Sequence, residues 1–375
     1  MRSQPLFLVQ NGPNPSTQFV PYPNYDHYES IPGGIRTTVL MARERSLVKR
    51  VGQKVPSRAG GELRVGIGDD AAVLRLRGAN DWVVTTDAFL EGVHFLAAHP
   101  PRMIGYKALA RATSDIAAMG ALPRYFFLNL AIPASRAGNW LDEFLRGLAQ
   151  AAVRFGLVLA GGDTTKYPRI ALNLTVLGEV KAGRAVLRSG ARPGDLIGVS
   201  GRLGEAEFGL RLFQQGLHKR RKEVRNLLRK HLRPEPRLAL GQWLAGTGLA
   251  SAMIDISDGL STDLAHLCEA SGVGAQIWVE KIPAVRIPAE LQRLRMDPLR
   301  MALDCGDDYE LLFTVPRRRA PRLPKRFRGI PLTIIGEVCR EKTLSLLELR
   351  GRSRPLHPRG WDPFRKRPGG RTNSF

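Results

Sequence analysis

The chain of 375 residues is poor in cysteine, and its few cysteines are arranged neither for disulfides nor for zinc. Cys268, Cys305 and Cys339 are odd in number, widely spaced and without a Cys-x-x-Cys pair. No run approaches the roughly 18 apolar residues of a membrane span, and residues 5–9 are too short for a signal-peptide core. These absences predict a protein of the reducing cytoplasm without a membrane segment.

Two familiar nucleotide-binding motifs are also missing. The sequence contains no Gly-x-x-x-x-Gly-Lys-Ser/Thr P-loop and no protein-kinase catalytic loop. No Ser, Cys or His has the sequence context of a catalytic triad, which argues against a covalent intermediate. If the chain transfers phosphate, catalysis must therefore depend on metal ions and on the positioning of the reactants.

Acidic residues are scarce relative to basic ones, because 34 Asp and Glu face 57 Lys and Arg and leave a net charge of +23. Segments 218–237, 317–328 and 350–371 each carry a net +7 and so hold +21 of that charge. Basic clusters can mark nucleic-acid binding. Because segment 218–237 has no interleaved aromatic residue, we favour solvated basic surfaces over a nucleic-acid site.

Length and an apolar fraction of 43% predict a globular chain of two domains. Residues 1–40 are rich in Pro, Asn, Ser and Gly without sustained periodicity, which favours a disordered extension. We expect an N-terminal α/β domain over 41–190 and a C-terminal α/β domain over 191–364, with a turn near Pro193 between them. Residues 365–375 form a basic tail.

Alternating strand-like and helix-like segments indicate an α/β (α+β) fold class. In the first domain, strands are expected near residues 63–67, 82–86, 125–132, 157–160 and 170–176, and helices near 101–119 and 140–155. In the second, strands are expected near 196–200, 252–256, 309–315 and 332–338, and helices after 204 and from about 260. The pattern therefore predicts two lobes of similar size.

Short acidic motifs recur along the nearly neutral remainder of the chain, at expected strand or helix ends. They are Gly68-Asp69-Asp70, Thr85-Thr86-Asp87, Ser114-Asp115, Gly162-Asp163-Thr164-Thr165 and Asp255-Ile256-Ser257-Asp258-Gly259. Mg²⁺ takes oxygen ligands from a few carboxylates while nucleotide phosphates complete its shell. Ordinary turns and helix caps can explain any single motif. Together, the motifs predict a phosphate-transfer site for several cations.

Asp115 is the most informative of these acids, because it interrupts the apolar face of a predicted helix. Ala108, Ala112, Asp115 and Met119 fall at i, i+4, i+7 and i+11 and share one inward-facing stripe. A buried carboxylate is costly unless it is paired, hydrogen-bonded or bound to a metal. The sequence leaves a salt bridge and a metal site as alternatives.

The order of these motifs closely resembles the thiamine-monophosphate kinase family over about residues 43–364. Single motifs are shared with the wider superfamily of aminoimidazole-ribonucleotide synthetase and selenophosphate synthetase. The combination that resembles the thiamine enzymes in particular is His94-Phe95, Asp307-Asp308-Tyr309-Glu310 and Gly360-Trp361-Asp362. The resemblance implies transfer of the γ-phosphate of ATP to thiamine monophosphate, with several Mg²⁺ ions and no phosphoenzyme. It also implies two α/β domains and a homodimer formed through the N-terminal sheet.

The resemblance further implies a set of site residues. By motif matching, the metal ligands are Asp70, Thr85, Thr86, Asp87, Asp115, Asp163, Asp255 and Asp258, of which Asp115 and Asp258 are expected to be catalytic. ATP is expected at Gly162, Asp163, Arg188 and Ser257. Thiamine monophosphate is expected at His94, Asp307 and Trp361, where Trp361 could stack on the cationic ring system.

Two positions depart from the family pattern. Asp307 stands where relatives commonly carry Glu, and Cys305 replaces a small residue beside it. The second interpretation is another ATP-dependent synthetase of the same superfamily, although no cysteine precedes Cys268 to support selenophosphate synthesis. A nucleic-acid-binding protein is the third. The favoured interpretation expects thiamine monophosphate and ATP as partners, with no specific nucleic acid and no membrane.

The charge distribution generates a first prediction. We expect weak DNA binding that fades between low and physiological salt, because basic clusters release counterions without reading bases. A fluorescence-anisotropy titration with two unrelated duplexes at increasing salt measures this. Nanomolar, sequence-dependent binding that persists at physiological salt would instead favour the nucleic-acid interpretation.

Overall fold

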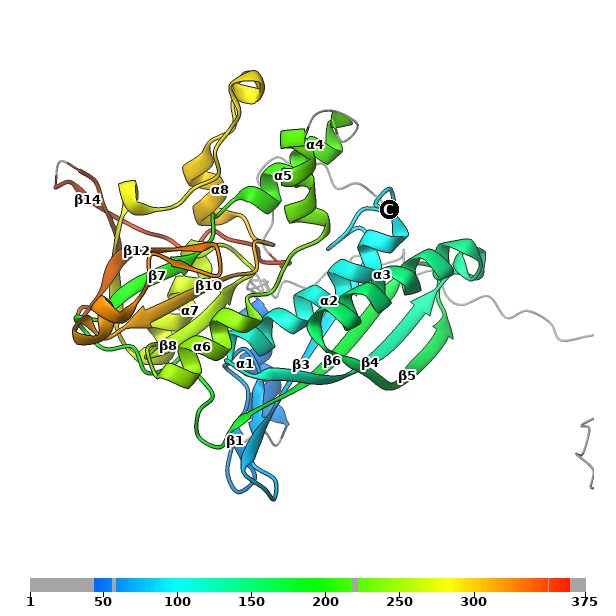
Figure 1. Cartoon of the computed structure of the whole chain (residues 1–375), viewed down its shortest axis with the longest axis horizontal. Coiled ribbons are helices and arrows are strands. Elements are labelled where there is room, and N and C mark those ends of the chain that lie inside the picture. Colours follow the sequence, from blue (N-terminus) through cyan, green and yellow to red (C-terminus); the bar gives the residue numbers. More distant parts are fainter. Residues whose placement is uncertain (1–43, 56–58, 218–221, 350, 365–375) are drawn as a thin grey trace, which may run out of the picture. The chain divides into compact units, whose positions relative to one another are not determined.

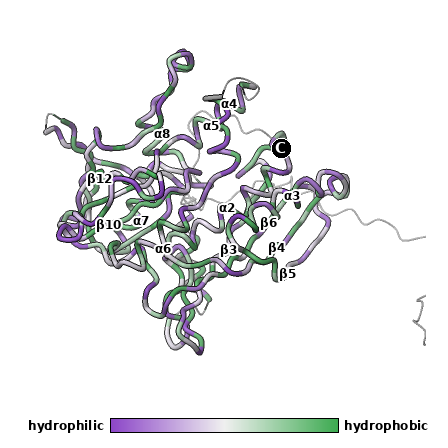
Figure 2. Tube along the Cα trace, viewed as in Figure 1, coloured by the Kyte–Doolittle hydropathy of each residue, from purple (hydrophilic) through white to green (hydrophobic). Residues whose placement is uncertain are grey.

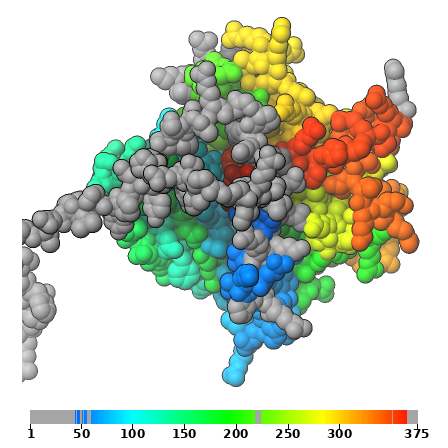
Figure 3. All heavy atoms as spheres, turned by 180° about the vertical axis from the view of Figure 1, so that it is seen from behind, coloured from blue at the N-terminus to red at the C-terminus, as the bar shows by residue number. Residues whose placement is uncertain are grey.

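The computed structural model describes residues 44–55, 59–217, 222–349 and 351–364, whose helices and strands are arranged as in Figure 1. The predicted extension at 1–40 and the basic tail at 365–375 lie outside the described residues. Two β-sheets with helices packed against them make up the described part, which confirms the predicted α/β (α+β) class. Seen from behind in Figure 3, the blue-to-green N-terminal lobe and the yellow-to-red C-terminal lobe lie on opposite sides.

The N-terminal lobe contains a six-stranded sheet and three helices. The strand order is β1 (Leu63–Val65), β2 (Ala72–Leu74), β3 (Asn80–Leu90), β6 (Ala171–Lys181), β4 (Leu122–Ile132) and β5 (Val158–Lys166). The helices are α1 (Glu44–Lys54), α2 (Pro101–Ala118) and α3 (Asn139–Phe155), and a short 3-10 helix, η1, covers Ala134–Arg136. All strand pairs are antiparallel except β4 and β5, which are parallel.

One face of this sheet is covered and the other is open. Along β6, Leu172, Leu174 and Val176 are buried in the same core cluster as residues of α2 and α3. Their neighbours Asn173 and Thr175 alternate onto the other face, as the two-residue period of a strand requires. Every residue of the edge strand β5 is exposed. The helices therefore cover one side of the sheet only.

The C-terminal lobe contains an eight-stranded sheet. The strand order is β14 (Ser353–Pro355), β13 (Leu344–Leu347), β9 (Gly274–Trp278), β12 (Ile330–Cys339), β7 (Leu196–Ser200), β10 (Glu310–Val315) and β8 (Ala252–Ile256), with β11 (Arg326–Phe327) beside β12. The helices are α4 (Glu205–Gln214), α5 (Lys222–Leu232), α6 (Leu238–Thr247), α7 (Leu260–Ser271) and α8 (Pro298–Asp304), with 3-10 helices η3 (Val279–Lys281), η4 (Ala289–Leu294) and η5 (Arg317–Arg322). Side chains of β10 alternate between two core clusters, one containing α7 residues and the other α6 residues.

Within the described part of the chain, no helix is long and apolar enough to cross a membrane. Figure 2 shows hydrophilic and hydrophobic stretches interspersed along the trace.

Helix α2 is buried on more sides than its predicted apolar stripe required. Besides α3 and the N-terminal sheet, it contacts α6 and β8 of the C-terminal lobe. A Cβ atom at Gly241 of α6 would lie 2.0 Å from the carbonyl oxygen of Ala117, so the two helices approach closely. The single-stripe prediction was therefore too narrow, because α2 packs against both lobes.

Two strands are longer than predicted, and the expected strand ends lie inside them. Thr85, Thr86 and Asp87 are central in β3, which pairs with β6 over its whole length. Gly162 and Asp163 lie inside β5, paired with β4. The ladder hydrogen bonds thus outweigh the turn preference of Gly and Asp. At Gly162 a side chain is excluded, since a Cβ atom would lie 1.9 Å from the carbonyl oxygen of Leu128.

The packing of α2 against α3 yields a second prediction. A Cβ atom at Gly147 of α3 would lie 1.8 Å from the carbonyl oxygen of Arg102, so Gly147→Ala must push the helices apart. We expect a loss of about 1–3 kcal/mol, typical of overpacking. The matched control is Gly246→Ala in α6, where the added methyl meets open space. Replacing a helical glycine there should gain about 0.5–1 kcal/mol. Urea denaturation compares both variants, and equal effects would contradict the close approach.

Candidate active site

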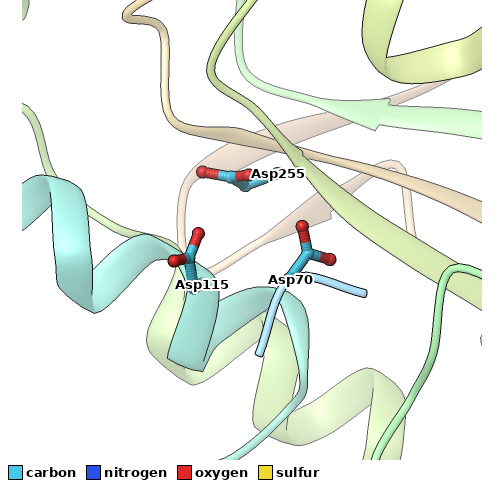
Figure 4. Close-up of side chains that lie close together, drawn as sticks. All are labelled: Asp70, Asp115 and Asp255. Atoms are coloured by element: carbon cyan, nitrogen blue, oxygen red, sulfur yellow. The ribbon is translucent and has the colours of Figure 1, made fainter. Parts of the chain in front are cut away.

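Three aspartates from distant parts of the chain converge where the two lobes meet. Asp70 lies before β2, Asp115 in the last turn of α2 and Asp255 on β8. One carboxylate oxygen from each lies within 4.8 Å of the others, and Figure 4 shows the three side chains around a common space. The structure thus brings together three of the predicted metal ligands.

The carboxylate cluster is unfavourable by itself. Burial, followed by the charge of Asp70, raises the pKa of Asp255 to about 7. Burial and the charge of Asp255 raise the pKa of Asp115 well above its usual range. Among the described residues, Oδ2 of Asp70 and Oδ2 of Asp255 are buried without a hydrogen-bond partner. Crowded carboxylates with unshared oxygens suit a hard divalent cation, so the three side chains fit Mg²⁺.

Two polar neighbours orient the cluster without neutralising it. Nη2 of Arg188 donates to Oδ1 of Asp70 at 2.6 Å, and Oγ1 of Thr85 on β3 donates to Oδ2 of Asp115 at 2.5 Å. One arginine cannot balance three carboxylates. Since the Arg188 side chain is 23% exposed, part of its guanidinium stays open to an anion.

The other predicted metal ligands of the N-terminal lobe are divided between the two faces of its sheet. Asp87 faces α2, where it accepts a hydrogen bond from Nη2 of Arg111 at 3.2 Å. Thr86 and Asp163 are exposed on the open side. Strand β5 is three strands away from β3 in the sheet, roughly 14 Å at normal spacing. Within one chain, Asp163 therefore lies too far from β3 to belong to the same site.

The loop after β8 connects the predicted nucleotide and acceptor residues. The carbonyl of Ser257 accepts a hydrogen bond from the N–H of Asp307 at 2.8 Å, and that of Asp258 accepts from the N–H of Trp361 at 2.9 Å. Burial, followed by the charge of Glu44, raises the pKa of Asp258 to about 7. Backbone contacts thus hold two acceptor residues beside the nucleotide residues.

His94 is held as a neutral imidazole. The N–H of Leu90 donates to Nδ1 of His94 at 3.0 Å, which leaves the ring proton on Nε2. Burial and the positive charge of Arg111 lower the pKa of His94 to about 4. At neutral pH this side chain can therefore donate a hydrogen bond from Nε2.

Sequence reasoning missed three side chains that surround Asp307. Nζ of Lys107 and the hydroxyl of Tyr309 each donate to its carboxylate, both at 2.7 Å. Burial opposes ionisation of Asp307, yet the charges of Lys107 and Arg111 lower its pKa below the usual range. The signal was available: Lys107, Arg111 and Asp115 fall at i, i+4 and i+8 on an otherwise largely apolar helix.

Comparison with known protein families assigns both lobes. Residues 68–180 match the family described as AIR synthase related protein, N-terminal domain, and residues 192–347 match the corresponding C-terminal domain. The thiamine-monophosphate kinase of Salmonella typhimurium is 39% identical over 301 residues, which cover 79% of this chain and 90% of the relative. The chain belongs to the thiamine-monophosphate kinase family. The Escherichia coli K12 member is 37% identical over 327 residues, covering 86% of this chain and 98% of its own.

Solved structures of the family agree with this membership. A structure of AaThiL complexed with AMPPCP and TMP has a TM-score of 0.76 at 30% identity, covering 86% of this chain and 97% of its own. The enzyme from Stenotrophomonas maltophilia has a TM-score of 0.66 at 36% identity, covering 80% and 94%. Hydrogenase maturation protein HypE of E. coli, at 21% identity and a TM-score of 0.60, covers 74% and 86% and shows the shared fold alone.

The carboxylate cluster yields a third prediction. At pH 8, above the pKa of Asp255, the change Asp255→Asn removes the charge of Asp255 from the crowded carboxylate cluster. The variant should therefore unfold at a higher temperature than the original protein in EDTA. With Mg²⁺ at about 100-fold above its Kd, the original protein should gain about 2.7 kcal/mol, whereas the variant should gain little. Thermal denaturation in EDTA and in Mg²⁺ shows whether the order of the two unfolding temperatures reverses.

Asp195→Asn is the matched control, because Asp195 is also buried but lies in a hydrogen-bonded setting. Its Oδ2 accepts from Oγ of Ser251 at 2.6 Å and from the N–H of Arg192 at 3.1 Å. The control should lose stability equally with and without Mg²⁺. If Asp255→Asn and Asp195→Asn respond alike, the three aspartates are structural.

Proposed function

We propose that this protein transfers the γ-phosphate of ATP to thiamine monophosphate, giving thiamine diphosphate, by direct in-line transfer assisted by several Mg²⁺ ions. The observation that carries the proposal is the convergence of Asp70, Asp115 and Asp255 within 4.8 Å in a chain of this family. Two anionic substrates repel each other, and a site of hard oxygen ligands is suited to gather their metal-bound phosphates.

The metal would be held by the three aspartates, and Thr85, which donates to Asp115, would complete their polar surroundings. When bound, Mg²⁺ supplies neutralisation of phosphate charge and alignment of the reacting groups. Thr85 keeps the Asp115 carboxylate in one rotamer, and Arg188 does the same for Asp70. Positioning of this kind provides the entropic part of the rate acceleration.

The nucleotide side would use Arg188 and Ser257, with Gly162 and Asp163 contributed from β5. Arg188 combines a fixed guanidinium with partial exposure, which suits a phosphate oxygen. Ser257 lies in the loop that also carries Asp258, so a nucleotide bound there meets the acidic cluster.

The acceptor side would use His94, Asp307 and Trp361. The ionised Asp307 attracts a cationic ring, Trp361 offers an aromatic face, and neutral His94 donates from Nε2. The acceptor phosphate has a second pKa near 6. At neutral pH it is already nucleophilic, so the chain needs no strong general base and no covalent intermediate.

A homodimer formed through the open side of the N-terminal sheet belongs to the same proposal. Exposed apolar side chains gather on the open side of β4 and β5: Leu122 (43%), Tyr125 (43%), Phe127 (39%) and Val158 (59%). Large exposed apolar patches mark protein interfaces. Thr86 and Asp163 lie on the same open side, so both would belong to this interface. The three cysteines, all free, suit a cytoplasmic location.

The fourth prediction tests the reaction. An assay of ADP release with Mg²⁺ and ATP should show turnover of thiamine monophosphate and much weaker turnover of thiamine or of aminoimidazole precursors. Asp115→Asn should lower turnover at least about 10²-fold, because it removes charge directed at the transferring phosphate. Equal phosphorylation of thiamine would disprove the acceptor, and full activity of Asp115→Asn would make that aspartate structural.

The fifth prediction tests the dimer. Phe127→Lys places a charge on the open side of the sheet and should convert a dimer to monomers in size-exclusion chromatography with light scattering. Val153→Lys is the control, since Val153 on α3 is 84% exposed and lies on the helical side of the lobe. Dissociation by both variants, or by neither, would argue against this interface.

A further inference from the structure

Lys107 is a buried cation that the proposed reaction does not yet use. Its side chain is 2% exposed, and its Nζ donates to Oδ2 of Asp307 at 2.7 Å. Lys107 belongs to α2 in the N-terminal lobe, whereas Asp307 lies between α8 and β10 in the C-terminal lobe. A buried ammonium group is costly unless a charged partner compensates it. This ion pair therefore joins the two lobes at the acceptor side of the site.

The backbone around Asp307 is strained and firmly anchored. Asp307 has φ of +70° and Tyr309 has φ of +51°, a region that side-chain-bearing residues rarely adopt. Asp308 accepts hydrogen bonds from the N–H groups of Gly204 and Ala206 at the start of α4. Such strain costs about 1–3 kcal/mol per residue and persists where the surroundings fix one conformation, often at functional sites.

Glu310 provides a second anchor for the same segment. It is fully buried, and it accepts hydrogen bonds from Oγ of Ser200 and from the guanidinium of Arg237. The anchors at Asp308 and Glu310 point away from Asp307 into the C-terminal lobe. Only Lys107 ties the segment to the opposite lobe through a side-chain ion pair among the described contacts.

Asp307 and Lys107 differ in how accessible their side chains are to a ligand. The side chain of Asp307 is 31% exposed, so a ligand can touch its carboxylate but not the buried ammonium group. Lys107 engages Oδ2 and the Tyr309 hydroxyl engages Oδ1, which fixes the carboxylate plane. A carboxylate has about four lone-pair sites, so acceptor capacity remains. The nearby His231, with Nδ1 3.5 Å from Nζ of Lys107, is uncharged at neutral pH because burial lowers its pKa to about 2.

We propose that Lys107 is a positioning residue for the acceptor substrate: it acts through Asp307, which it holds charged and in one orientation across the lobe boundary. The proposal rests on the proposed function, since the ligand of Asp307 is the cationic ring of thiamine monophosphate. Lys107 does not touch the substrate. Its loss should weaken acceptor binding and leave ATP binding unchanged.

The experiment compares Lys107→Met, Asp307→Asn and the double variant with the original protein. Steady-state kinetics give kcat and both KM values, and calorimetry without ATP gives the Kd for thiamine monophosphate. Lys107→Met should raise KM and Kd for thiamine monophosphate at least about tenfold, as expected when one partner of a buried charge pair is lost. The KM for ATP should stay within about twofold. The double variant should match Asp307→Asn, because the two residues act as one unit.

Arg237→Met is the control for general destabilisation, because it removes a largely buried cation that anchors the same segment at Glu310. It should lower Tm without changing the KM for thiamine monophosphate. If Lys107→Met does not fold, Asp307→Asn and the double variant still test the proposal. The double variant should fold, because it leaves neither charge of the pair unpaired. A double variant with a clearly higher KM than Asp307→Asn, or an unchanged KM in Asp307→Asn, would overturn the proposal.

These experiments distinguish a failure of the proposed reaction from a failure of the positioning role of Lys107. If Lys107→Met weakens the binding of thiamine monophosphate but the original protein releases no ADP, the proposed reaction is wrong and the positioning role stands. If it turns over thiamine monophosphate and Lys107→Met keeps its KM and Kd, the positioning role alone is wrong.

Discussion

Mutual repulsion of three carboxylates where the lobes meet is the constraint on which the rest of the structure depends. Asp70, Asp115 and Asp255 come from a loop, a helix and a strand, so no local element imposes their proximity. The packing of two lobes must hold them together against an electrostatic cost. A fold that pays this cost without ligand has a site ready for cations, since the energy of binding then includes relief of repulsion.

Helix α2 is the element that meets the constraint. Its close glycine contacts with α3 and α6 fix it between the lobes, where Lys107, Arg111 and Asp115 follow one another on successive turns. Asp115 serves the carboxylate cluster, Arg111 pairs with Asp87, and Lys107 pairs with Asp307. The same helix thus carries charged side chains along the site, from Asp115 at the carboxylate cluster to Lys107 at the proposed acceptor side. Small residues elsewhere on α2 allow the close packing that keeps these side chains in register.

The sequence predicted the fold class and most elements because hydrophobic periodicity reports on burial directly, as for α2 and α3. It failed where pairing between strands overrode local preference, at Thr86 in β3 and at Asp163 in β5. The cluster of Asp70, Asp115 and Asp255 was predicted through ordered motifs, and their spacing alone could not have shown it. Lys107 was missed, because a buried lysine and a surface lysine look alike until the partner from the other lobe is known. The domain limits at 41–190 and 191–364 stay predictions.

Because the N-terminal sheet has two faces, one chain brings together only part of the predicted set of metal ligands. Side chains on alternate positions of β3 point to opposite sides, so Thr85 and Thr86 cannot both face α2. Thr85 reaches Asp115, while Thr86 bonds to Asn173 and contacts Thr175 on the open side. Asp163 lies on that side too, on an edge strand whose outer hydrogen-bonding groups have no neighbouring strand within the described chain. Exposed apolar residues beside an open strand edge are an arrangement that proteins normally cover. If a second copy covers it, Thr86 and Asp163 lie in the interface, while the aspartate cluster on the helical side needs no change.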